Sequence, residues 1–76
     1  MNASFTPIPT RQQTGWTAEK QRRFIETLAA TGSVTEAATS VFMTARSAYY
    51  LRSRPSAAAF ARAWDKALRI AAPRLV

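Results

Sequence analysis

The 76-residue sequence contains no cysteine and no histidine. Without cysteine the chain forms no disulfide and has no thiol nucleophile, and without histidine it has no imidazole to act as a general base. Cysteine and histidine are also the usual ligands of zinc. The four acidic residues do not cluster, and the two glycines, Gly15 and Gly32, form no glycine-rich phosphate-binding loop. The composition therefore argues against an enzyme, a metal site and a bound cofactor.

Long apolar runs are also missing from the sequence. No stretch approaches the roughly 18 apolar residues that a membrane-spanning helix needs, and the first residues lack the basic start and apolar run of a signal peptide. We therefore expect a soluble, cytoplasmic protein without a membrane partner. A chain of 76 residues provides material for one domain with a modest core.

Acidic residues are few compared with basic ones. Lys and Arg number 11 against 4 Asp and Glu, which gives a formal net charge of +7. Such an excess favours a polyanionic partner, either nucleic acid or an anionic membrane surface. Most of these cations are arginine, whose planar guanidinium group matches phosphates and guanine edges better than the ammonium group of lysine does. Nucleic acid is therefore the expected partner, and the alternative is a basic surface that is only solvated.

The pattern of apolar residues divides the chain into an arm and one helical domain. Residues 1–15 contain Pro7 and Pro9 and have no apolar periodicity, so we expect a flexible N-terminal arm. Residues 16–76 show helical spacing in four segments. The expected helices cover about residues 18–30, a short segment from 34, residues 45–53 and residues 57–72. The predicted fold class is an all-α bundle of about four helices.

Hydroxyl residues and a glycine mark the ends of these helices. Thr17, Ser33 and Thr44 are suitable N-caps, and Gly32 can end the first helix in the left-handed conformation. Ser33 and Glu36 have the spacing of a capping box, in which the serine hydroxyl accepts from the third helical amide and the glutamate bonds back to the serine amide. The second helix is therefore expected to begin directly beside Gly32.

The second and third expected helices have the spacing of a helix-turn-helix, in which three or four residues join two helices that cross at a steep angle. A small residue is needed where the helices cross, and Ala38 provides it. Val41 and Met43 flank the turn, and Ala48 and Leu51 are the inward residues of the third helix. The apolar pattern therefore predicts that this helix turns its opposite face to solvent.

On these residues the chain resembles the helix-turn-helix superfamily, specifically the three-helix, homeodomain-like modules of small bacterial and phage proteins. The resemblance covers Gly15 to about Leu68, with a tryptophan that opens the first helix and an AWD-containing helix after the third. It implies DNA binding, with Thr44–Arg54 as the recognition helix in the major groove. Related turns usually hold glycine four residues after the small alanine, where this chain has Phe42. Because a bulky residue resists the left-handed conformation, we expect Phe42 to avoid it and to be at least partly buried.

Helical geometry selects the residues that would contact DNA. With Ala48 and Leu51 inward, the expected readers of base edges are Ala45, Arg46, Tyr49, Tyr50 and Ser53. Arg46 could bind guanine with both guanidinium nitrogens, or it could contact a phosphate. Adjacent helical residues differ by roughly 100°, so one of the two tyrosines should pack inward. The expected phosphate-binding residues are Lys20, Arg22, Arg23, Thr44, Arg52 and Arg54. Arg11 of the arm is expected either to enter the adjacent minor groove or to remain disordered.

The expected function is sequence-selective binding of double-stranded DNA by a small, nucleoid-associated transcriptional regulator. A phage-type packaging factor that recognises DNA, similar to a small terminase, fits the same residues. A module that binds and inhibits a protein partner is the alternative from another class, since an acidic protein surface would attract the same charge. A membrane-surface helix fits less well because the cations are spread over all the expected helices.

Two copies of the chain are expected on one DNA site, since a single short helix reads only a few base pairs. The contact between copies is expected on the last helix. Its Phe60, Trp64 and Leu68 would face the core, and four small residues would leave its remaining surface open to close approach by a second helix: Ala57, Ala61, Ala67 and Ala71.

Overall fold

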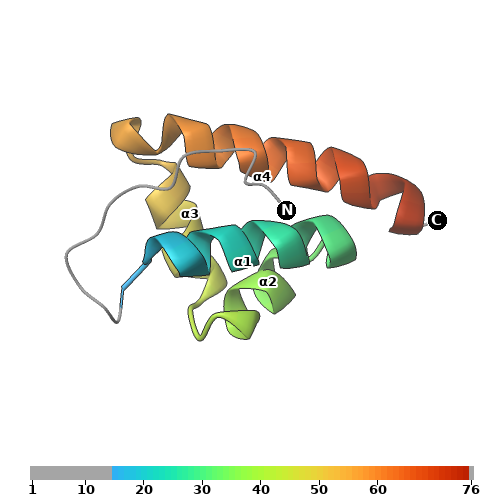
Figure 1. Ribbon diagram of the computed structural model, residues 1–76, viewed down its shortest axis with the longest axis horizontal. Helices are drawn as coiled ribbons and strands as arrows, with labels where there is room; N and C mark the ends of the chain where they lie inside the picture. The colour runs from blue at the N-terminus through green and yellow to red at the C-terminus, as the bar shows by residue number, and fades with distance from the viewer. Residues whose placement is uncertain (1–14, 76) are drawn as a thin grey trace.

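The computed structural model describes residues 15–75, which fold into four α-helices and two short 3₁₀ helices (Figure 1). The elements in chain order are α1 (Ala18–Thr31), α2 (Val34–Ser40), α3 (Ala45–Arg52), η1 (Pro55–Ala57), α4 (Ala58–Ala71) and η2 (Ala72–Leu75). α1 and α4 lie side by side, α2 packs against α1, and α3 leads from α2 to the start of α4. The prediction of a small all-α bundle is confirmed. Residues 1–14, which include most of the expected arm and Arg11, lie outside the described residues.

The helix ends follow from local hydrogen bonds that the sequence predicts. Three hydroxyl groups each accept from the backbone amide three residues further on, at 3.0–3.2 Å: those of Thr17, Ser33 and Thr44. Gly32 ends α1 with φ 69°, and its amide donates to the Leu28 carbonyl at 2.7 Å. One bond differs from expectation, because the Ser33 amide donates to the Thr31 hydroxyl at 3.1 Å and not to Glu36.

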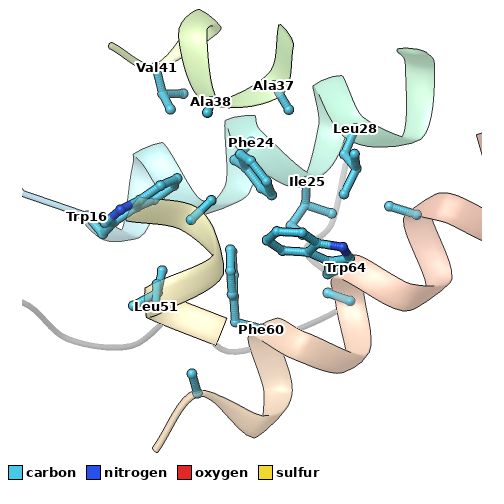
Figure 2. Close-up of a cluster of buried hydrophobic side chains, with 14 residues drawn as sticks. Trp16, Phe24, Ile25, Leu28, Ala37, Ala38, Val41, Leu51, Phe60 and Trp64 are labelled. Atoms are coloured by element: carbon cyan, nitrogen blue, oxygen red, sulfur yellow. The ribbon is translucent and has the colours of Figure 1, made fainter. Parts of the chain in front are cut away.

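Four aromatic rings form the centre of the core between α1 and α4. Trp16, Phe24, Phe60 and Trp64 are turned toward one another (Figure 2), and their ring centroids are separated by 5.1–6.1 Å in five pairwise contacts. Tilted and edge-on aromatic contacts at such distances stabilise a core beyond the effect of burial alone. These rings therefore hold the start of α1 and the first half of α4 together, and α3 packs beside them.

Alanine side chains let the helices approach closely around these rings. Ala38 of α2 and Ala48 of α3 are fully buried, as the sequence predicts, and Ala37 beside them is also fully buried. The prediction for α4 is wrong in part. Three alanines that were expected to face outward are buried, and these are Ala57 of η1 and Ala67 and Ala71 of α4. Leu68, expected in the core, lies at the edge and is 37% exposed. Because small side chains allow a close helix–helix contact, the alanine stripe of α4 faces inward.

Candidate nucleic-acid interface

Residues 41–44 form the four-residue turn between α2 and α3. Three backbone hydrogen bonds close this turn: the amides of Val41 and Met43 donate to the Ala38 carbonyl at 3.1 and 2.9 Å, and the Phe42 amide donates to the Thr39 carbonyl at 3.0 Å. Ala38 and Val41 are buried beneath the turn. The turn therefore has the length that the sequence predicts, and a network of backbone bonds sets the direction in which α3 leaves it.

Phe42 is the one residue of this turn whose conformation contradicts the sequence-based expectation. Its φ is 62°, in the left-handed region, and its side chain is 89% exposed. The expectation of an extended or right-handed, partly buried residue is therefore wrong. The backbone reverses within four residues while its amides bond back to α2. This reversal gives a positive φ to Phe42, at the position where the helix-turn-helix resemblance implied glycine.

The outward face of α3 carries three of the five expected base-reading residues, and all three are exposed. These are Arg46, Tyr50 and Ser53, and they lie on the side of the helix opposite the buried Ala48 and Leu51. Arg46 belongs to the first turn of α3. The Ser53 hydroxyl donates to the Tyr50 carbonyl at 2.7 Å and ends the helix. The structure therefore brings a guanidinium group, a phenol and a hydroxyl together on one exposed helix face.

Tyr49 and Ala45 lie beside this face, and Tyr49 contacts α4. The Tyr49 ring packs 5.0 Å from the Trp64 ring, yet the side chain is 54% exposed, and its neighbour Tyr50 is 72% exposed. Neither tyrosine is in the core, so the expectation that one of them packs inward is wrong. The small Ala45 is half-buried. An aromatic residue at the edge of a helix face can rest one side on a neighbouring ring and keep the other side in solvent.

Arg52 faces α4, although the sequence predicted a phosphate contact for it. Its Nη1 lies 3.1 Å from Oδ1 of Asp65, and its guanidinium carbon lies 4.8 Å from the centroid of the Trp64 ring. A guanidinium group that both stacks on an aromatic face and pairs with a carboxylate has a fixed orientation. Arg52 therefore attaches the last turn of α3 to α4.

The other end of α3 is attached to the beginning of α1. The indole Nε1 of Trp16 donates to the Ser47 hydroxyl at 2.7 Å, and the buried Gln21 holds Trp16 in place because its Nε2 donates to the Trp16 carbonyl at 2.8 Å. The Lys20 ammonium group lies 3.9 Å from the sulfur of Met43 in the turn. These contacts place the first turn of α1 directly beside the amino end of α3.

Two of the expected phosphate-binding residues meet at a groove beside the turn. The groove has a volume of about 570 Å³ and is lined by Thr17, Ala18, Glu19, Lys20, Arg23, Ser40, Val41 and Phe42. Lys20 and Arg23 therefore lie close to Phe42, while Arg22 is half-buried elsewhere on α1. Arg54 is exposed just after α3, and the hydroxyl of Thr44 is used as the cap of that helix.

The sequence-based selection missed three cations on α4. Arg62, Lys66 and Arg69 are exposed and follow the i, i+4, i+7 spacing that places them on one helix face. Within the described residues none of them forms a salt bridge, since the pair that is present joins Arg52 and Asp65. Their spacing could have identified them from the sequence. The positive charge of the protein therefore extends over the outer face of α4 as well as the surroundings of α3.

Other kinds of site find no support in the described part of the chain. No group of three metal-ligating side chains is present among those residues. None of the helices in residues 15–75 has the length and apolar character required to cross a membrane. Comparison with known protein families, curated proteins and solved structures gives no match to this chain.

Proposed function

We propose that this protein binds double-stranded DNA sequence-selectively as a small, nucleoid-associated transcriptional regulator. The proposal rests on the way the fold exposes one face of α3 and holds both of its ends. Its outward face is exposed, and both of its ends are attached to the rest of the fold through the Trp16–Ser47 and Arg52–Asp65 contacts. The four-residue turn before it agrees with the helix-turn-helix resemblance. In a helix-turn-helix the second helix of the motif, here α3, enters the major groove with its amino-terminal residues.

Arg46 is assigned the main base contact in this proposal. It is exposed in the first turn of α3, where a guanidinium group can donate two hydrogen bonds to O6 and N7 of guanine. Lys20 and Arg23, which line the groove beside the turn, are assigned to phosphates. The net charge of +7 supports a partner with many negative charges.

A DNA-packaging factor would use the same α3 surface, and a protein partner with an acidic face would meet the same cations. Salt dependence separates protein binding from DNA binding. For duplex DNA the logarithm of affinity falls linearly with the logarithm of salt concentration, with a slope of about −0.9 for each phosphate neutralised. A regulator is distinguished from a packaging factor by where its selected sites lie, in promoters or beside packaging origins.

Two copies on one site remain part of the proposal, because a helix of eight residues spans only a few base pairs. The alanines expected at the contact between copies do not support it, since Ala57 of η1 and Ala67 and Ala71 of α4 are buried within the protein. Sedimentation of the protein with its selected duplex tests this part. Two chains on an inverted repeat with half-sites about 34 Å apart is the expected result, and one chain on an asymmetric site would contradict it.

The decisive experiment is selection of bound sequences from a random duplex pool, with Arg46→Ala and Arg23→Ala as matched variants. Arg46→Ala is expected to lose about 1–3 kcal/mol at one base position and to relax the preference there. Arg23→Ala should weaken all sequences equally and reduce the salt slope by about 1. A motif that Arg46→Ala leaves unchanged would contradict the assignment of Arg46. Absence of salt-dependent duplex binding by the native protein would contradict DNA binding itself.

A further inference from the structure

Two properties of Phe42 contribute nothing to the stability of the folded protein. A residue with a Cβ atom in the left-handed region is strained, and glycine would remove that strain at this position. The ring is also 89% exposed, so it contributes almost no packing to the core. Strained residues that the surrounding backbone holds in place occur preferentially at functional sites. The exposed ring of Phe42 is therefore a candidate for contact with another molecule.

The surroundings of Phe42 indicate the chemistry of that contact. The groove beside the ring holds two cations, Lys20 and Arg23, against one acid, Glu19, so its rim has a net positive charge. Phe42 precedes the cap of α3 by two residues, and an extended chain of that length spans at most about 7 Å. The ring therefore lies at the amino end of α3, the end that also carries Arg46.

We propose that Phe42 is a specificity-determining residue that contacts the 5-methyl group of a thymine in the major groove. This inference rests on the proposed function, and it adds an apolar base contact to the polar one assigned to Arg46. Phenylalanine in contact with the thymine methyl is an established form of base readout. Lys20 and Arg23 would bind phosphates beside it, because their side chains share the groove with Phe42.

The test uses the DNA site that the native protein selects from a random duplex pool. Each thymine of that site is replaced in turn by uracil, which removes only the 5-methyl group. For the native protein, one replacement is expected to weaken binding about four-fold, the effect of burying one methyl group. Phe42→Ala should bind the thymine and uracil duplexes equally at that position. Phe42→Leu, which keeps an apolar side chain, should recover part of the discrimination.

Two controls make the outcome decisive. Phe42→Ala keeps the Cβ atom and removes an exposed ring, so its thermal unfolding should match that of the native protein. Ile70→Ala, which removes an exposed apolar side chain of α4 outside the proposed interface, should leave the discrimination at the Phe42-dependent position intact. If each thymine-to-uracil replacement weakens binding of Phe42→Ala and of the native protein equally, the inference is wrong and DNA binding still stands. A native protein that binds no duplex in a salt-dependent manner would overturn the proposed function as well.

Discussion

Replacing Phe42 by glycine should make the folded protein more stable. The left-handed conformation at φ 62° costs a residue with a Cβ atom about 1–2 kcal/mol. Glycine removes this cost, and its greater freedom in the unfolded chain takes back about 0.5–1 kcal/mol. The ring is 89% exposed, so its removal leaves no cavity. The expected net gain is about 0.5–1 kcal/mol, which raises the thermal midpoint by about 2–8 °C for a domain of this size.

Circular dichroism during heating measures this gain, and urea unfolding checks that the slope m stays the same in both proteins. Phe42→Ala is the matched control, because it removes the ring and retains the Cβ atom that causes the strain. Its midpoint should stay close to that of the native protein. A lower midpoint for Phe42→Gly would show that the ring stabilises the fold. An equal rise for both variants would show that exposure of the ring, and not the backbone, was unfavourable.

Three further substitutions test the packing around α3 and the end of α1. Trp64→Ala should cost about 3–5 kcal/mol and leave little folded protein by circular dichroism, because Trp64 is buried among several rings. Asp65→Asn should lower the free energy of unfolding by less than about 1 kcal/mol, an effect that should shrink in high salt, because its pair with Arg52 is partly exposed. Gly32→Ala should lower the thermal midpoint, since alanine at φ 69° costs about 1–2 kcal/mol. A midpoint that does not change in Gly32→Ala would contradict the assigned cap.

The sequence predicted those parts of the fold that depend on neighbouring residues. Thr17, Ser33 and Thr44 cap their helices because each cap bonds to an amide only three residues away. Gly32 ends α1 for an equally local reason. The sequence failed for α4, where the direction of the alanine stripe depends on how closely α1 approaches. That distance follows from the packing of the whole core, and Ala67 alone does not reveal it.

In the candidate site, too, the sequence predicted the residues whose position depends on their own helix and missed those that depend on other elements. The exposed position of Arg46 and Tyr50 follows from helical geometry once the inward residues are known. Arg52 could not be placed correctly, because its partners Trp64 and Asp65 lie on another helix. Phe42 was misjudged for a different reason. A bulky residue usually avoids the left-handed region, but three backbone hydrogen bonds of the turn determine the conformation of Phe42.

The attachment of α3 at both ends also has a thermodynamic consequence for binding. A free peptide of eight residues is too short to remain helical in water. Here the indole of Trp16 and the guanidinium group of Arg52 link the two ends of the helix to the core before any ligand arrives. Under the proposed function, DNA binding therefore requires no folding of α3, so the binding free energy carries no cost for the backbone entropy that coupled folding loses. Calorimetry of binding should accordingly give a heat-capacity change that the apolar area of the contact alone explains.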